Sequence, residues 1–166
     1  MSTQKIHIIG GPGSGKTYIA SKLAIMDNIT TYDLDQVFWD QSQATYVRAS
    51  QEVRSAKLNE ILAQSSWVIE GVYYKWLAPS FEDADVIIVL TTPLWKRQWR
   101  ISKRFITRKF FQGQYQKETL KSFIELWKWN RDFDRDNLAR IKTFIAHHQH
   151  KVRYCDSLEQ VKRELR

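Results

Sequence analysis

Eight consecutive residues near the start of the chain constrain it most: Gly10-Gly11-Pro12-Gly13-Ser14-Gly15-Lys16-Thr17. They follow the apolar run 6–9 and precede apolar residues at helical spacing. The pattern G-x-x-x-x-G-K-[ST] between a strand and a helix is typical of a phosphate-binding loop, because glycines permit left-handed backbone and the helix N-terminus attracts anions. We expect Lys16 to reach the β- and γ-phosphates of a nucleotide and the Thr17 hydroxyl to ligate Mg²⁺. The alternative is an ordinary glycine-rich turn.

The composition is that of a single folded domain. The 166 residues fit one domain, and 43% apolar residues can bury a full core. The lone cysteine, Cys155, excludes an internal disulfide and is expected to be a buried thiol. We recognise no signal peptide and no stretch long enough to span a membrane, so we expect a cytoplasmic protein without a membrane partner.

The positive charge is concentrated in one segment. The net charge is +8, yet no acidic residue lies between Asp85 and Glu118. Without the basic residues of that segment, 18 basic residues balance 18 acidic ones, so the segment is a candidate site and not a general surface property. The basic residues are Lys96, Arg97, Arg100, Lys103, Arg104, Arg108, Lys109 and Lys117.

Strands and helices are expected to alternate along the chain. Alternation predicts a parallel sheet covered on both faces, whose strands all end at one edge, where ligands bind. A break is expected at Gly113 and a bend near 132–136, and Ser157 is expected to cap the last helix. We predict strands over 5–9, 29–33, 67–70, 85–90 and 151–155, and helices over 17–25, 50–64, 94–110, 117–148 and 158–165, with an irregular or helical link over 73–81.

Carboxylates follow two of the predicted strands. Asp33 and Asp35 follow the second strand, and alternation places both on the same side of an extended segment. Two carboxylates beside a phosphate-binding loop can hold Mg²⁺ through water, and one can orient or deprotonate a hydroxyl group. Glu70, before Gly71, ends the third strand and is expected to face the same ion. The alternatives are a solvated turn or helix cap for the aspartates and a solvated acid for Glu70.

The predicted helix over 94–110 has two opposed faces. One face is apolar, and we expect it to be buried: Trp95, Trp99, Ile106 and Phe110. The other carries arginines, whose planar forks suit phosphate oxygens, with a merely solvated face as the alternative: Arg97, Arg100, Arg104 and Arg108.

Other polar and aromatic groups have weaker patterns. Aromatic residues after Glu70 either wall a pocket or pack under a loop: Tyr73, Tyr74 and Trp76. Two later arginines, Arg131 and Arg135, are expected to pair with neighbouring aspartates. A histidine cluster is interpreted as a solvated loop and not a metal site: His147, His148 and His150.

Taken together, these motifs resemble the adenylate-kinase-like P-loop proteins called DNA topology modulation proteins, over most of the chain through about Arg108. The resemblance rests on GGPGSGKT, Asp33-Leu34-Asp35, Val68-Ile69-Glu70-Gly71-Val72-Tyr73, Asp85–Leu90 with Thr-Thr-Pro, and the arginine-rich helix. It implies an α/β P-loop NTPase fold, a sheet of order 2-3-1-4-5, a lid at about 97–117 and phosphoryl transfer from ATP. Glu70-Gly71 resembles the Asp-Gly of adenylate kinases, and Asp33-Leu34-Asp35 the Asp-x-Asp of shikimate-type kinases. The Pro-Arg that follows Asp-Gly in adenylate kinases is replaced here by Val72-Tyr73.

The sequence thus favours an ATP- and Mg²⁺-dependent kinase acting on a small molecule or nucleotide. We expect Asp35 to orient the acceptor, and Arg100 and Arg104 to neutralise charge on the transferred phosphoryl group. Asp33 and Glu70 are expected to hold Mg²⁺ through water. The expected nucleotide contacts are Gly10, Gly11, Pro12, Gly13, Ser14, Gly15, Lys16, Thr17, Tyr18 and Arg97. The alternative is a nucleotide-switched regulator whose basic helix lies on DNA or RNA.

Overall fold

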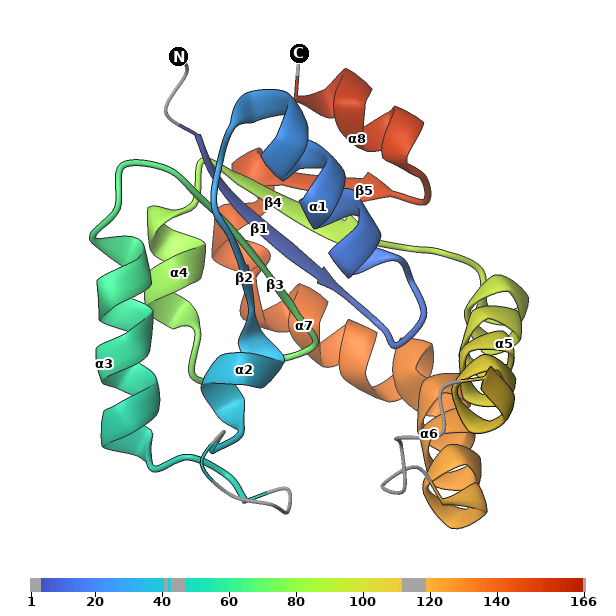
Figure 1. Cartoon of the computed structure of the whole chain (residues 1–166). Coiled ribbons are helices and arrows are strands. Elements are labelled where there is room, and N and C mark those ends of the chain that lie inside the picture. The colour runs from blue at the N-terminus through green and yellow to red at the C-terminus, as the bar shows by residue number, and fades with distance from the viewer. Residues whose placement is uncertain (1–3, 41, 43–46, 112–118, 166) are drawn as a thin grey trace.

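The computed structural model describes residues 4–40, 42, 47–111 and 119–165. Five parallel strands form one sheet of order β2-β3-β1-β4-β5, with helices on both faces (Figure 1). This confirms the predicted P-loop fold and strand order. The strands are β1 (Lys5–Gly10), β2 (Thr31–Asp33), β3 (Trp67–Gly71), β4 (Val86–Leu90) and β5 (Val152–Cys155).

Two hydrophobic cores lie on the two faces of the sheet. On one face, α1 (Lys16–Asp27) and α8 (Leu158–Glu164) cover side chains such as Ile8 and Val68. On the other face, α2 (Leu34–Phe38), α3 (Gln51–Leu62), α4 (Ala78–Asp83) and α7 (Ala139–Phe144) cover Trp67 and Ile69. Because both faces are covered, the three central strands β1, β3 and β4 are mostly apolar and almost fully buried, as in other parallel sheets, whereas the edge strands β2 and β5 are partly exposed.

The predicted long helix over 117–148 is divided into several elements. These are α6 (Leu120–Phe133), the π-helix η1 (Asp134–Leu138), α7 and the 3₁₀-helix η2 (Ala146–Lys151). The π-helix occurs where a bend was predicted, and such turns frequently mark functional sites. The predicted break at Gly113 lies outside the described residues.

Element boundaries follow local hydrogen bonding. The Ser50 and Ser157 side chains accept hydrogen bonds from the backbone of Val53 and Gln160, which confirms Ser157 as a cap. The second strand is shorter than predicted, because Asn28 ends α1 in left-handed backbone, at φ 54°, and the chain becomes a strand only at Thr31. Cys155 is fully buried, as predicted. Among the described residues, we find no helix both long and apolar enough to cross a membrane.

The prediction for the apolar face of the basic helix is wrong. This helix, α5 (Leu94–Phe111), lies beside α6 beyond the edge of the sheet, and Phe105 stacks on Phe123 at 4.5 Å between ring centroids (Figure 1). Three members of the expected buried face are exposed: Trp95 by 68%, Trp99 by 60% and Ile106 by 53%. The Phe110 side chain lies outside the described part of the chain. The helix turns Arg97 and Ile101 inward instead, because it packs on the phosphate-binding loop and not on a purely apolar surface.

Candidate functional site

The loop between β1 and α1 has the backbone of an anion cradle. Gly13 and Gly15 have positive φ angles of 72° and 98°. A Cβ atom at Gly13 would lie 2.6 Å from the carbonyl oxygen of Arg97, so both conformation and space require glycine there. The loop is therefore held against α5 with its backbone bent around an open centre.

Polar groups of the loop fit a bound phosphate chain. Gly15, the N-cap of α1, supplies no side-chain cap, so the first N–H groups of the helix keep their capacity to bind an anion. The buried Ser14 Oγ has no hydrogen-bond partner within the described residues. Lys16 Nζ donates to the Gly11 carbonyl oxygen at 3.1 Å, which folds the ammonium group over the loop.

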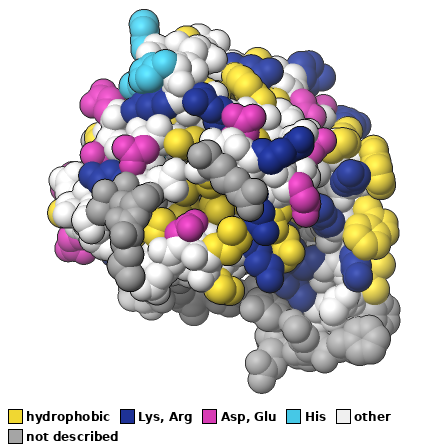
Figure 2. Space-filling view, turned by 90° about the horizontal axis from the view of Figure 1, so that it is seen from above, with side chains coloured by type: hydrophobic (Ala, Val, Ile, Leu, Met, Phe, Trp, Pro, Cys, Tyr) yellow, Lys and Arg dark blue, Asp and Glu magenta, His cyan; other side chains and the backbone are white. Residues whose placement is uncertain are grey.

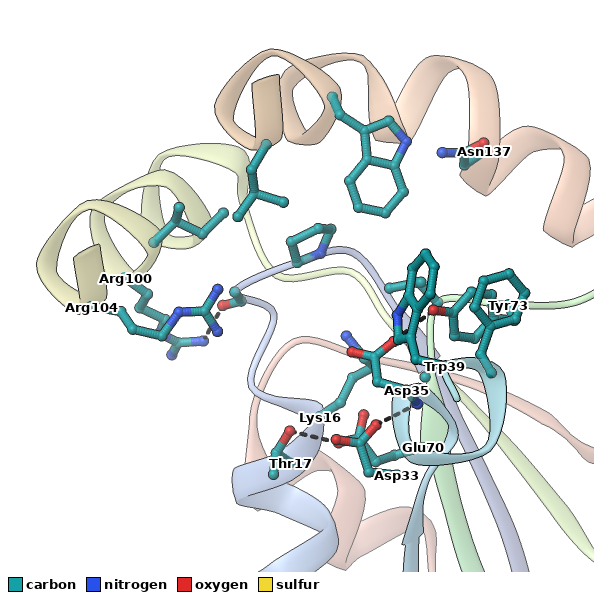
Figure 3. A pocket seen from close by; sticks show the side chains of 18 of the residues that line it. Lys16, Thr17, Asp33, Asp35, Trp39, Glu70, Tyr73, Arg100, Arg104 and Asn137 are labelled. Atoms are coloured by element: carbon teal, nitrogen blue, oxygen red, sulfur yellow. Dashed lines mark hydrogen bonds between the residues drawn. The ribbon is translucent and has the colours of Figure 1, made fainter. Parts of the chain in front are cut away.

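The predicted carboxylates meet beside this loop (Figure 3). Asp33 pairs with Glu70 in the register of β2 and β3, so the two strands deliver both acids to one edge. Thr17 Oγ1 donates to Glu70 Oε1 at 2.6 Å, which joins the loop to β3. These hydroxyl and carboxylate oxygens are the hard ligands that Mg²⁺ prefers. Within the described residues, no group of three or more His, Cys, Asp or Glu side chains is arranged to hold a metal ion.

Of the two aspartates, Asp33 lies on an extended segment, at the end of β2, whereas Asp35 does not, contrary to the prediction. Asp33 is the N-cap of α2, and its Oδ1 accepts from the Asp35 backbone N–H at 2.8 Å. Asp35 therefore stands in the first turn of a helix, because the capping aspartate starts α2 directly after β2. Both carboxylates still line the same cavity.

Burial shifts the ionisation of three groups at the site. Burial raises the pKa of Glu70, against the opposing effects of Lys16 and the Thr17 hydrogen bond. Burial also raises the pKa of Asp33, and it lowers the pKa of Lys16 although Glu70 and Asp35 oppose the change. All three groups are thus shifted toward their neutral forms in the free protein. Bound phosphate and Mg²⁺ would stabilise the charged forms.

Two of the predicted arginines face the loop from the opposite side to the carboxylates (Figure 3). Arg100 Nη1 donates to the carbonyl oxygens of Gly13 and Ser14 at 3.1 and 3.0 Å. Arg104 and Arg108 line the cavity beside it. The site therefore has a cationic and an anionic wall with the phosphate-binding loop between them.

The predicted nucleotide contacts divide into those that line the cavity, Pro12, Gly13, Gly15, Lys16 and Thr17, and those that do not, Gly10, Gly11, Ser14, Tyr18 and Arg97. Arg97 is 1% exposed and donates to Asp134 Oδ2 at 2.8 Å. It lies under the loop, since a Cβ atom at Gly11 would come within 2.5 Å of Arg97 Nη1. Tyr18 faces solvent on α1, with Lys22 Nζ 5.6 Å from its ring centroid. Neither side chain lines the cavity.

The cavity, about 1180 Å³, also includes residues that the sequence did not reveal. Trp39 and Arg48 meet through an isolated antiparallel bridge, and Asn137 enters from the π-helix (Figure 3). Their positions depend on long-range packing, and no local motif marks them. The predicted aromatic residues both line the cavity and pack against the core: Tyr73, Tyr74 and Trp76. The Tyr73 hydroxyl donates to Asp35 Oδ1 at 2.7 Å.

Two arginines, Arg48 and Arg54, lie on the ring of Phe38, and of the two Arg48 lines the cavity. The Arg48 guanidinium lies 5.0 Å from the Phe38 ring centroid, and that of Arg54 lies 5.4 Å from Phe38 and 5.3 Å from Trp76. Arg54 is 5% exposed, and its Nη1 has no hydrogen-bond partner within the described residues. Burial and the charge of Arg48 lower the pKa of Arg54. The part of the cavity lined by Arg48 suits an anionic group.

The remaining sequence predictions concern residues away from the cavity. Arg131 pairs with Asp132 at 3.2 Å and Arg135 with Asp136 at 2.8 Å, which confirms the local ion pairs. The predicted histidine cluster falls in η2, whose residues are not buried.

Comparisons with known proteins agree with this geometry. Residues 6–120 match the model of a protein family described as AAA domain. The fold is similar to the crystal structure of a shikimate kinase from Bacteroides thetaiotaomicron, with 17% identity, a TM-score of 0.55, and coverage of 96% of this chain and 92% of that one. It is also similar to a gluconokinase from Sinorhizobium meliloti 1021, with 12% identity, a TM-score of 0.52, and coverage of 98% and 89%. At these identities the two likenesses show the fold alone. A search of curated proteins found no match.

Proposed function

Because the chain belongs to the AAA domain family of P-loop proteins, we propose that it is an ATP- and Mg²⁺-dependent kinase acting on a hydroxyl group of a small molecule or nucleotide. One observation carries this proposal: Lys16 and Thr17 of the phosphate-binding loop share a single cavity with Asp35. At about 1180 Å³, this cavity exceeds the usual range for one small ligand, so it has room for a nucleotide and an acceptor.

The loop and its neighbours bind the nucleotide in this proposal. Residues 10–17 surround the phosphates, and Lys16 moves from the Gly11 carbonyl to the β- and γ-phosphates. Thr17 would bind Mg²⁺ directly, with Asp33 and Glu70 acting through water. When bound, the ion neutralises charge on the phosphates.

Asp35 orients the acceptor hydroxyl or takes its proton. Tyr73 holds one carboxylate oxygen, Oδ1, through a 2.7 Å hydrogen bond, which leaves the other oxygen for the acceptor. Arg48, which lines the cavity, favours an acceptor with a carboxylate or phosphate group remote from the reacting hydroxyl. The acceptor class in this proposal is therefore a hydroxylated anion.

Arg100 and Arg104 complete the cationic side of the site. During transfer, negative charge is spread over the oxygens of the phosphoryl group, and arginines at this position stabilise it. Residues 97–117, of which 112–117 are outside the described part, form the lid of this proposal.

The alternative of a nucleotide-switched DNA- or RNA-binding regulator is favoured by the basic residues of α5. The inward direction of Arg100, Arg104 and Arg108 favours the kinase. An Arg100→Gln/Arg104→Gln variant separates the two, because glutamine preserves the helix. We expect a loss of turnover. The regulator would instead be favoured if turnover is unchanged and the slope of log DNA affinity against log salt concentration becomes shallower by about two units.

The direct test compares two lysines of α1. Lys16→Ala is expected to abolish ATP turnover and weaken triphosphate binding, with little change in stability, whereas Lys22→Ala on the exposed face should resemble wild type. Labelled ATP and a panel of hydroxylated carboxylates, sugar phosphates and nucleotides would identify the acceptor. Turnover by Lys16→Ala at the wild-type rate would refute the assignment of the loop.

The carboxylates should separate by role in the same assay. We expect Asp33→Asn and Glu70→Gln to raise the Mg²⁺ concentration required for turnover. Asp35→Asn should reduce acceptor phosphorylation while ATP and Mg²⁺ binding persist. Identical Mg²⁺ midpoints in all variants would refute the roles of Asp33 and Glu70.

A further inference from the structure

The outer face of α5 carries an apolar stripe at the surface. We name Trp95, Trp99 and Ile106 the outer stripe; all three side chains are more than half exposed. Their spacings of four and seven residues place them along one line of the helix. Along the α5 side of the molecule, hydrophobic side chains lie next to Lys and Arg at the surface (Figure 2).

Exposed lysines flank the outer stripe. Lys96 Nζ lies 5.5 Å from the Trp95 ring centroid, and Lys103 Nζ lies 5.1 Å from that of Trp99. Helix α5 thus sorts its cations by type, with arginines toward the loop and cavity and lysines toward solvent. No acidic residue occurs in α5, so all of its charged side chains are positive.

We propose that the outer stripe docks the protein on an anionic lipid surface. Tryptophan rings favour the headgroup level of a bilayer, where an aliphatic side chain such as Ile106 reaches the acyl boundary. Lysine stems lie along the apolar layer while their ammonium groups stay at the charged headgroups. The sequence-based expectation of no membrane partner rested on the lack of a spanning segment, which does not bear on surface binding.

Charge and side-chain type favour lipid over the other occupants. A second copy of this face would bring Lys96 and Lys103 against their own counterparts without compensating acids from α5. Single-stranded nucleic acid stacks on aromatic rings, but Ile106 offers no ring, and the arginines best suited to phosphate face inward. An anionic bilayer can both bury the outer stripe and place negative headgroups beside its lysines.

Docking through this face leaves the candidate active site open. Ile101, Arg104 and Phe105 line the cavity from the opposite side of the same helix. Docking is therefore independent of the proposed kinase function, and either can fail without the other.

The test is co-sedimentation of the full-length protein with phosphatidylcholine vesicles, with and without phosphatidylserine. We expect binding only to the anionic vesicles, reduced on the order of tenfold or more in Trp95→Gln/Trp99→Gln. Lys96→Gln/Lys103→Gln should weaken it by about fivefold per lysine. The matched control is Ile25→Gln/Met26→Gln, which removes exposed apolar side chains from α1 and should bind as wild type.

Circular dichroism and ATP affinity verify that each variant is folded. The proposal is overturned if the wild-type protein does not bind anionic vesicles, or if the tryptophan variant binds them as well as wild type does. It is also overturned if the outer stripe instead supports a dimer in analytical ultracentrifugation, or binding of a single-stranded oligonucleotide, without vesicle binding.

Discussion

The ion pair beneath the phosphate-binding loop should respond asymmetrically to the removal of its two partners. Arg97 is 1% exposed, whereas the Asp134 side chain is 49% exposed. Asp134→Ala leaves a buried guanidinium with no carboxylate partner among the described residues, a 3.4 Å hydrogen bond to the Asn130 carbonyl oxygen and the Phe133 ring centroid at 5.6 Å. Loss of one partner of a buried ion pair typically lowers the free energy of unfolding by about 3–5 kcal/mol. Because Asp134 is half exposed to solvent, which screens the pair, we expect a loss of about 3 kcal/mol.

Arg97→Met removes the buried charge itself and keeps most of the apolar stem. The lost charge-assisted hydrogen bond at 2.8 Å predicts about 1.5 kcal/mol, since the remaining Asp134 carboxylate can rehydrate. The double variant should be destabilised by about the same 1.5 kcal/mol. The two substitutions are therefore expected to couple by about 3 kcal/mol.

Urea unfolding of nucleotide-free protein measures these free energies. Lys103→Met, an exposed cation on the same helix, is the control and should change stability by less than about 0.5 kcal/mol. A double variant destabilised by the sum of its single variants would refute the pairing argument. Unaltered stability of Arg97→Met together with lost ATP affinity would mean that Arg97 contacts nucleotide directly, as the sequence predicted.

Further predictions concern the loop and the carboxylates. Gly13→Ala forces a Cβ atom toward the Arg97 carbonyl oxygen in left-handed backbone, so urea unfolding should show a loss of about 1–3 kcal/mol, and ATP turnover should fall. Burial raises the pKa of Glu70 above its ordinary value of 4.5. Between these two pKa values the folded protein keeps a proton that the unfolded chain releases, so the free energy of unfolding falls as pH rises through this range. In Glu70→Gln, the free energy of unfolding by urea should fall less steeply with pH. An unchanged pH dependence would contradict the raised pKa of Glu70. Tyr73→Phe removes the hydrogen-bond donor to Asp35. In steady-state kinetics, this change should lower kcat about tenfold without changing ATP affinity. An equal loss of ATP affinity would argue that Tyr73 does not act through Asp35.

The parts of the fold that were predictable from the sequence depend on local patterns. Residues 10–17 specify their loop almost alone, since each glycine and Lys16 has its own steric or electrostatic reason. The central strands are short, mostly apolar runs. The rule that parallel strands end at one edge correctly placed Asp33 beside Glu70.

The orientation of α5 was not predictable in this way. Helical periodicity shows that Trp95 and Trp99 share a face, but it does not show which face is buried. Here a charged residue, Arg97, is buried because Asp134, 37 positions later, accepts its hydrogen bond and the loop lies against it. Hydrophobicity alone would therefore predict burial of the wrong face of α5.

The end of the cavity lined by Trp39, Arg48 and Asn137 was likewise not predictable from the sequence. Trp39 and Arg48 come together through a single bridge, and Asn137 reaches the cavity from a π-helical turn. Neither arrangement has a local sequence signal. Arg54 carries no motif, and only its burial between two rings makes it notable.

The strand order also has a consequence for synthesis on the ribosome. β1 is made first, but its neighbours begin much later, since Lys5 pairs with Trp67 and Ile6 pairs with Val86. At 5–20 residues per second, the fully apolar Ile6, Ile8 and Ile9 wait roughly 3–12 s for the first of these partners. Through that interval both edges of the strand are unpaired, so the segment that becomes the centre of the sheet is exposed to mispairing in the nascent chain.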